Sequence, residues 1–162
     1  MLTISPLLPR PDHLETCIAW SDREWRALTG FTTHDWQIEF HRMMTAPVDE
    51  IFVALLDDMP VGMVWMIEKE GLESHAHLTP WLSNLVVDAK HRGRGIGRAL
   101  VSHVAHYVAL GGDPTLHLLT HTPAVYLNMG WDMMEMAELR KRPIYVMSRD
   151  LSYLHRTRLY GT

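Results

Sequence analysis

The sequence has a single cysteine, Cys17, among its 162 residues. One cysteine excludes an intrachain disulfide and any metal site that needs two thiolates from the same chain. We expect Cys17 to be a buried core residue. The longest uninterrupted apolar run, residues 51–56, is far shorter than the roughly 20 residues that a membrane-spanning helix requires. The first residues lack a basic segment followed by a long apolar one, so we expect no signal peptide and a cytoplasmic protein.

The sequence also lacks a surplus of positive charge. It contains 15 Lys and Arg and 19 Asp and Glu, which gives a net charge of −4. Proteins that bind nucleic acids or membrane surfaces need a basic face, so neither partner is expected. Apolar residues make up 47% and charged residues 21% of the chain, a globular composition that excludes a disordered protein. We therefore predict one domain over residues 1–162, with its core in about 1–150 and a short peripheral tail over 151–162.

Two amino-terminal segments have the periodicity of amphipathic helices. Apolar residues recur at helical spacing over residues 11–28. A second helix is predicted to begin near Thr32, because Asp35 follows at the spacing of a capping box. Phe31 and Trp36 lie on either side of this cap at the spacing of a hydrophobic staple. Most of the tryptophans in these helices and beyond are expected in the core.

The remainder of the chain alternates strands with helices. Residues 51–56 and 61–67 are strand candidates on either side of a short acidic turn and predict a hairpin. Residues 68–80 are polar and predict a loop. Further along, strands are predicted over 81–88, 115–120 and 144–147, and helices over 99–110 and 123–129.

A glycine-rich segment between an apolar strand and an amphipathic helix is the most informative feature of the sequence. It consists of Arg92, Gly93, Arg94, Gly95, Ile96 and Gly97. Glycines let the backbone approach a ligand closely, and the start of the next helix offers N–H groups and the positive end of the helix dipole. Together they predict a site for an anion such as pyrophosphate, and Arg92, Arg94 and Arg98 can add charged contacts. The alternative is a tight turn with solvated arginines.

Two common phosphate-binding motifs fit this segment poorly. The Walker A loop ends in Gly-Lys-Ser/Thr, whereas Gly97 is followed by Arg98 and Ala99. The dinucleotide fingerprint is G-x-G-x-x-G, whereas the spacing here is G-x-G-x-G. A nucleoside triphosphatase and a dinucleotide-binding enzyme are therefore disfavoured.

Residues 87–100 resemble the acyl-coenzyme A signature of the GNAT N-acetyltransferase superfamily. That signature is Gln/Arg-x-x-Gly-x-Gly/Ala after a strand that ends in an aliphatic residue, and Arg92, Gly95 and Gly97 occupy its positions. Residues 126–131 resemble a companion segment, Tyr-x-x-x-Gly-Phe/Trp, near the carboxyl end of the family's domain. The predicted order of elements also fits over about residues 1–150.

The resemblance implies a single-domain, GNAT-like α/β fold with a central, mixed but mostly antiparallel sheet flanked by helices. It implies acetyl-CoA as co-substrate, with the pyrophosphate on the glycine-rich loop and the pantetheine arm beside the strand that precedes it. The cofactor-binding residues carried over are Leu85, Val86, Val87, Arg92, Gly93, Arg94, Gly95, Ile96, Gly97 and Arg98.

The resemblance also implies the catalytic groups. The strand before the loop is expected to bulge, and the backbone N–H of Leu85, or of its neighbour Val86, would polarise the thioester carbonyl as in an oxyanion hole. A neutral amine would attack directly in a ternary complex, without a covalent enzyme intermediate. Tyr126 matches the family's general acid and would protonate the leaving thiolate. The alternative is that Tyr126 is a structural core residue.

The general base has no clear place in the sequence. Many relatives carry a glutamate on the strand before the loop, but residues 81–87 contain no carboxylate. The candidates are Glu68, at the end of the hairpin, and His77, before this strand, with Glu24 in the first helix as a weaker one. A water relay is the alternative.

These features predict transfer of an acetyl group from acetyl-CoA to a primary amine of a small molecule or peptide. The alternatives are transfer of a different acyl group and a non-catalytic module that binds coenzyme A. The eleven histidines include no pair with a third ligand at a recognised spacing, so we expect no metal. No motif identifies the acceptor, and a homodimer is left open.

Overall fold

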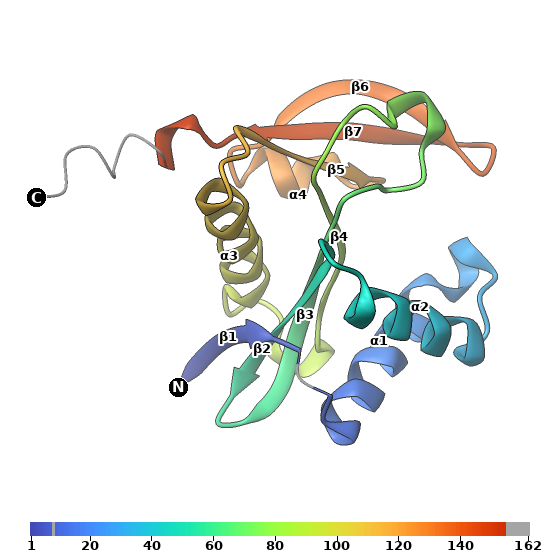
Figure 1. Ribbon diagram of the computed structural model, residues 1–162, viewed down its shortest axis with the longest axis vertical. Coiled ribbons are helices and arrows are strands. Elements are labelled where there is room, and N and C mark those ends of the chain that lie inside the picture. The colour runs from blue at the N-terminus through green and yellow to red at the C-terminus, as the bar shows by residue number, and fades with distance from the viewer. Residues whose placement is uncertain (8, 155–162) are drawn as a thin grey trace, which may run out of the picture. The chain divides into compact units, whose positions relative to one another are not determined.

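The computed structural model describes residues 1–7 and 9–154 (Figure 1). Its elements are β1 (Leu2–Pro6), α1 (Pro11–Thr29), α2 (Thr33–Thr45), β2 (Glu50–Leu56), β3 (Met59–Ile67), β4 (Trp81–Val87), α3 (Ile96–Leu110), β5 (Thr115–Thr120), α4 (Pro123–Leu127), β6 (Asp132–Leu139) and β7 (Arg142–Asp150), with short 3-10 turns at Glu73–His75 and Ala89–His91. The strands are hydrogen-bonded in the order β1-β2-β3-β4-β5-β7-β6. β4 pairs with β5 in parallel, whereas β1–β2, β2–β3, β5–β7 and β6–β7 are antiparallel. This confirms the predicted mixed, mostly antiparallel sheet.

The described chain forms two compact units. The first unit contains residues 1–66 and 84–101, and the second contains residues 67–83 and the chain from Ser102 onward. The glycine-rich loop therefore belongs to the first unit, and Tyr126 belongs to the second. Strand β4 and helix α3 each continue from one unit into the other.

The amino-terminal helices of the first unit begin and end where the local sequence predicts (Figure 1). At the start of α2, the Thr32 hydroxyl accepts a hydrogen bond from the N–H of Asp35 at 3.2 Å, and the Asp35 carboxylate accepts one from the N–H of Thr32 at 2.8 Å. The rings of Phe31 and Trp36 pack with their centroids 5.2 Å apart. The capping box and the hydrophobic staple are both confirmed. None of the helices in the described ranges is long and apolar enough to cross a bilayer.

The hairpin of the first unit is tighter than predicted. Asp57 and Asp58 have φ values of 49° and 67° and form a two-residue turn, so β3 begins at Met59. β1, which pairs with β2, was not predicted, because its exposed and half-buried side chains give no clear alternation. In β3, an added Cβ on Gly62 would lie 3.0 Å from the backbone oxygen of Val86. Glycine at this position therefore lets β3 approach the end of β4.

The second unit is built on β5, β7 and β6 and on the first half of β4. Its largest fully buried side chains are those of Trp81, Trp131, Leu116, Leu118, Met147 and Leu151. Leu151 also donates its N–H to the backbone oxygen of Pro114 at 2.8 Å. The segment expected as a peripheral tail over 151–162 thus begins inside the core, and its residues 155–162 lie outside the described part of the chain.

The strand β6 is the largest element that the sequence did not predict. Its residues, Asp-Met-Met-Glu-Met-Ala-Glu-Leu, are mostly good helix formers and show no alternation of apolar and polar side chains. Pairing with β7 determines its conformation. The turn between them is made by Arg140 and Lys141 at φ values of 53° and 62°, without the Asn-Gly or Asp-Gly pair that signals such a hairpin.

Candidate active site

The glycine-rich loop leads from the end of β4 into α3. Gly93 and Gly95 have φ values of 75° and 80°, and no heavy atom lies within 4 Å of the position that a Cβ would take on either residue. The helix begins at Ile96, and its first backbone bond runs from the N–H of Ala99 to the oxygen of Gly95 at 3.0 Å. The loop thus leaves open space beside its backbone at the positive end of a fifteen-residue helix, which suits a pyrophosphate group.

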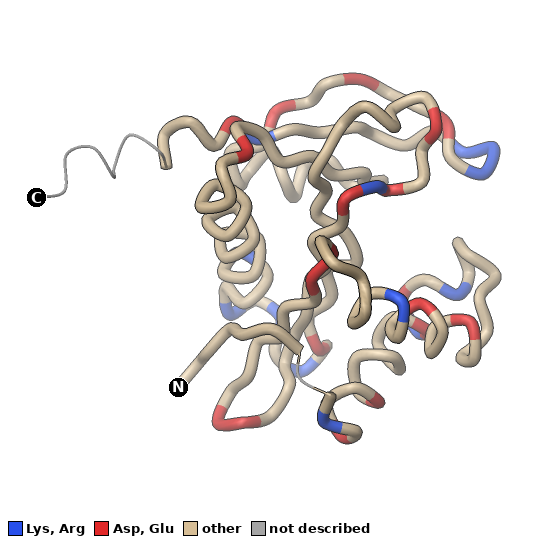
Figure 2. The backbone as a smooth tube through the Cα atoms, viewed as in Figure 1, with Lys and Arg blue, Asp and Glu red and all other residues tan. Residues whose placement is uncertain are grey.

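The arginines around the loop are exposed, and one of them is held by the protein itself. Arg92 donates from Nε to the backbone oxygen of Val87 at 3.1 Å and from Nη2 to Glu24 Oε1 at 2.8 Å. Arg92 therefore ties the loop to β4 and α1, and Glu24 is an ion-pair partner in this arrangement. Arg94 and Arg98 are exposed, in the loop and in the first turn of α3. Figure 2 shows blue stretches of Lys or Arg near the start of α3.

Strand β4 is irregular at Asn84, directly before Leu85. Asn84 has a φ of 45°, in the left-handed region, which asparagine tolerates better than most residues. Its side chain accepts a hydrogen bond from Trp25 Nε1 at 2.6 Å and donates one to Ser21 Oγ at 2.9 Å. These contacts hold Asn84, and with it the irregular part of β4, against α1. It lies where the resemblance implies a bulge, and the role of the Leu85 N–H stays a prediction.

Tyr126 lies on the short helix α4 and is half-buried. Its ring packs edge-on against Trp131 with the centroids 6.0 Å apart. Burial raises the pKa of the Tyr126 phenol above its ordinary value, so the hydroxyl keeps its proton to higher pH than an exposed tyrosine does. These properties suit a proton donor, and the catalytic role of Tyr126 stays a prediction.

The two main candidates for the general base are exposed. Glu68 and His77 both lie in the loop between β3 and β4. The ring of His77 stacks on that of His75 with the centroids 6.3 Å apart. His75 in turn contacts Ser74 Oγ through Nδ1 at 2.7 Å and the carboxylate of Glu135 on β6 through Nε2. The loop is therefore fastened to β6, and the roles of Glu68 and His77 stay predictions.

Glu70 is a candidate that the sequence analysis missed. Its Oε1 accepts a hydrogen bond from the hydroxyl of Ser83 on β4 at 3.2 Å. Burial raises the pKa of the Glu70 carboxyl to about 8. Nothing in the polar run 68–80 indicates which of its charged residues is partly shielded from solvent, because this shielding depends on β4, which returns beside Glu70 at Ser83.

A glutamine at position 70 tests the perturbation of this half-buried carboxyl. Folded Glu70 binds its proton more tightly than the unfolded chain does, so wild-type stability falls as pH rises from about 4.5 through about 8. Glu70→Gln carries no charge, so its melting temperature should rise relative to wild type between pH 5 and pH 9. Thermal unfolding of both proteins across this range measures the difference. A difference that does not change with pH would place Glu70 in water.

No group of three or more His, Cys, Asp or Glu side chains in the described chain lies close enough together to hold a metal ion. The thiol of Cys17 is fully buried, as predicted, and burial raises its pKa to about 12.

The structure is similar to those of several known acetyltransferases, although no curated protein matches the sequence significantly. An aminoglycoside 6'-N-acetyltransferase in complex with coenzyme A superposes with a TM-score of 0.76 at 18% identity, over 92% of this chain and 97% of that chain. An aminoglycoside 6'-N-acetyltransferase from Enterococcus faecium gives 0.71 at 20% identity, over 92% and 97%. A chimera of the spermidine N-acetyltransferase from Vibrio cholerae gives 0.71 at 14% identity, over 94% and 96%.

These structural likenesses establish the fold, since all three identities are low. The family follows from the sequence, because the profile of the acetyltransferase (GNAT) family matches residues 14–131. This range includes the glycine-rich loop, the irregular strand before it and Tyr126. With most of its length matched by this profile, the chain belongs to the GNAT family of acetyltransferases.

Proposed function

We propose that this acetyltransferase moves an acetyl group from acetyl-CoA to a primary amine of a small molecule or peptide, by direct attack in a ternary complex. The observation that carries the proposal is the open loop at Gly93 and Gly95, which follows a strand with a left-handed residue directly before Leu85. The structural neighbours act on aminoglycosides and spermidine, which are amines, and one of them was crystallised with coenzyme A.

Each group in the proposed site has a separate task. The backbone N–H groups of residues 93–97 bind the pyrophosphate, and the edge of β4 near Val87 orients the pantetheine arm. When bound, acetyl-CoA supplies an electrophilic thioester carbonyl and a thiol leaving group. The N–H of Leu85 donates to the carbonyl oxygen and stabilises the negative charge that develops there. Tyr126 donates its phenolic proton to the departing sulfur.

Arg92 has a positioning role in this scheme. Because its guanidinium is bound to Glu24 and to the oxygen of Val87, it holds the loop against α1 and β4. Exposed Arg94 and Arg98 are the side chains that would meet the phosphates. A local positive surface of this kind is enough to attract a phosphate group to a chain whose net charge is negative.

The wider assignment is one acetyltransferase domain over residues 1–162, acting in the cytoplasm without a metal, as a monomer or a homodimer. Transfer of a longer acyl group and a non-catalytic module that binds coenzyme A are the competing functions. Thiol release with a panel of amines separates them, because a module binds coenzyme A without turnover, and comparison of acetyl-CoA with longer acyl-CoA esters identifies the acyl group.

Ligand-induced stabilisation tests the cofactor assignment. Acetyl-CoA at 100 times its dissociation constant should stabilise the folded chain by about 2.7 kcal/mol and raise its melting temperature by several degrees. NADH and ATP share phosphates with acetyl-CoA but lack the pantetheine arm, so they should raise it less. Thermal unfolding with each ligand measures the shifts. Equal shifts for the three ligands would remove the assignment to coenzyme A.

A further inference from the structure

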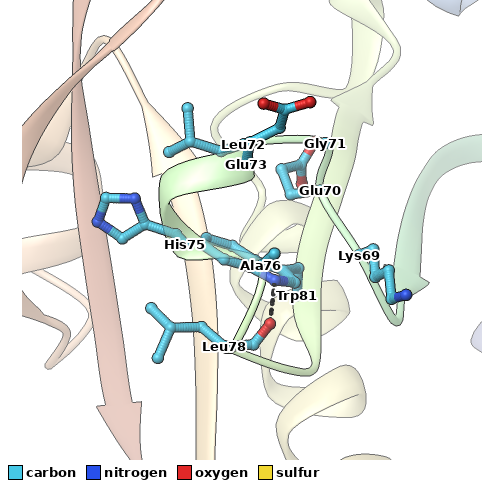
Figure 3. A pocket seen from close by; sticks show the side chains of 9 residues that line it. All are labelled: Lys69, Glu70, Gly71, Leu72, Glu73, His75, Ala76, Leu78 and Trp81. Atoms are coloured by element: carbon cyan, nitrogen blue, oxygen red, sulfur yellow. Dashed lines mark hydrogen bonds between the residues drawn. The ribbon is translucent and has the colours of Figure 1, made fainter.

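A cavity of about 280 Å³ lies in the second unit, between the β3–β4 loop and the start of β4 (Figure 3). Its lining consists of Lys69, Glu70, Gly71, Leu72, Glu73, His75, Ala76, Leu78 and Trp81. The indole of Trp81 donates a hydrogen bond from Nε1 to the backbone oxygen of Leu78 at 2.8 Å, which fixes the ring as one wall. His75 is anchored to Glu135 on β6, so the opposite part of the loop is also held in place.

The volume limits the part of a ligand that can lie inside the pocket to a small group. Pockets that hold drug-sized ligands measure about 300–1,000 Å³, so this cavity is at the lower limit. A cavity of about 150 Å³ accommodates one benzene molecule, which suggests about a dozen non-hydrogen atoms here. An aminoglycoside is too large to enter as a whole.

The walls combine an apolar surface with one half-buried carboxyl. Leu72, Leu78 and Trp81 present hydrocarbon and aromatic surface, and Glu70 is the acid that burial perturbs. The other charged or titratable groups on the lining are Lys69, Glu73 and His75. Lys69 and Glu73 are exposed, so Glu70 is the carboxyl that lies against the apolar walls. This arrangement suits a ligand that has a single amine on an apolar body, because each further charge taken out of water would need a partner of its own.

Strand β4 carries both a residue of the cavity and Leu85, the proposed donor to the thioester carbonyl. Trp81 and Ser83 belong to β4, and Ser83 bonds to Glu70. Two residues along a strand span about 7 Å, so Ser83 lies within that distance of Leu85, the proposed donor to the thioester carbonyl.

We propose that this cavity binds the acetyl acceptor, that the acceptor is a compact monoamine with an apolar or aromatic body, and that Glu70 takes the proton from its ammonium group. The proposal rests on the proposed acetyl transfer and specifies its substrate class and its base. In this proposal the general base is Glu70, and not Glu68 or His77, the candidates taken from the sequence.

The proton balance closes with groups already named. The bound ammonium gives one proton to the Glu70 carboxylate, and the lone pair of the amine forms the new C–N bond as the C–S bond breaks. Tyr126 donates its proton to the sulfur. The nitrogen releases a second proton to solvent, from which Tyr126 recovers its own, and Glu70 then returns its proton to solvent. The products are an amide and a free thiol.

The first experiment compares acceptors by thiol release at saturating acetyl-CoA. 2-Phenylethylamine should be acetylated with a kcat/KM at least about tenfold above those of spermidine and kanamycin, the scale of discrimination that an apolar pocket provides. Equal or better turnover of spermidine or kanamycin would overturn the assigned substrate class. The pH profile of kcat/KM for 2-phenylethylamine should rise through about pH 8, as Glu70 loses its proton.

The second experiment removes the base. Glu70→Gln keeps the shape of the side chain and should lower kcat/KM by about 10²–10⁴-fold. Its remaining kcat/KM should show no inflection near pH 8 and should follow only the deprotonation of the free amine at higher pH. Glu138→Gln is the matched control, because Glu138 is exposed on β6 and outside the cavity, and it should keep the wild-type profile. An unchanged profile in Glu70→Gln would return the base to Glu68, His77 or water.

The third experiment measures binding without turnover. Ala76→Phe places a ring in the cavity, whereas Ala27→Phe adds the same ring to the exposed surface of α1. Titration of tryptophan fluorescence with 2-phenylethylamine should saturate in wild type and Ala27→Phe, and should weaken at least about tenfold in Ala76→Phe. Normal acetyl-CoA stabilisation without amine binding would overturn this inference alone. Amine binding without any acetyl-CoA stabilisation would instead overturn the proposed function.

Discussion

Tyr126→Phe lowers kcat by about 10²–10⁴-fold and leaves acetyl-CoA affinity at the wild-type value, if the phenol is the general acid. The substitution removes only the hydroxyl. The ring can still pack against Trp131 on the short helix α4, so the fold should lose little stability. The glycine-rich loop belongs to the first unit of the structure and contains none of the altered atoms.

The pH dependence adds a second readout to this experiment. Because burial raises the pKa of Tyr126, the wild-type phenol keeps its proton beyond the ordinary range, and kcat should fall only at high pH. The phenylalanine variant has no such proton and should show no matching fall. The measurement is kcat against pH for both proteins with one accepted amine. Wild-type kcat in the variant at every pH would leave Tyr126 with a structural role only.

Gly95→Val should abolish acetyl-CoA binding while the chain still folds. A branched side chain would fill the open space beside the loop backbone, which the pyrophosphate needs. It would also strain a residue whose φ is 80°, at a cost of about 1–3 kcal/mol. The measurement is acetyl-CoA affinity by calorimetry, together with the melting temperature.

Gly30→Val is the control that separates the effect of backbone strain on stability from the loss of acetyl-CoA binding. Gly30 ends α1 with a φ of 70°, and an added Cβ there also meets no heavy atom within 4 Å. Both variants should therefore lose similar stability, whereas only Gly95→Val should lose the ligand. Normal acetyl-CoA affinity in Gly95→Val would show that the loop is no more than a turn between β4 and α3.

Features set by neighbouring residues could be predicted from the sequence. The capping box of Thr32 and Asp35 and the hairpin around residues 57–60 each depend on a few adjacent side chains. The glycine-rich loop likewise carries its conformation in its own residues, since glycine is the residue that adopts positive φ most readily. Residues close together in the sequence are therefore sufficient to predict most of the helices and strands, though not β1 and β6, and to indicate the family.

Features set by distant contacts could not be predicted. Glu70 is perturbed because β4 returns beside it at Ser83, and Asn84 is held by two residues of α1 more than fifty positions earlier. β6 is a strand because it pairs with β7, although its residues favour a helix. In the candidate site, the glycine-rich loop could therefore be predicted from the sequence. The proposed general base, Glu70, could not, because its environment depends on distant residues.

The position of β6 at the end of the strand order has a consequence for solubility. In the described chain its outer edge has no strand beside it, and Met134 and Met136 are 44% and 58% exposed there. A straight edge with such side chains invites intermolecular strand pairing and aggregation. The shift in register between Met133 and Glu135 bends this edge, and the acidic Glu138 adds a charge to it. We therefore expect the irregularity in β6 to disfavour open-ended association of the folded chain at high concentration.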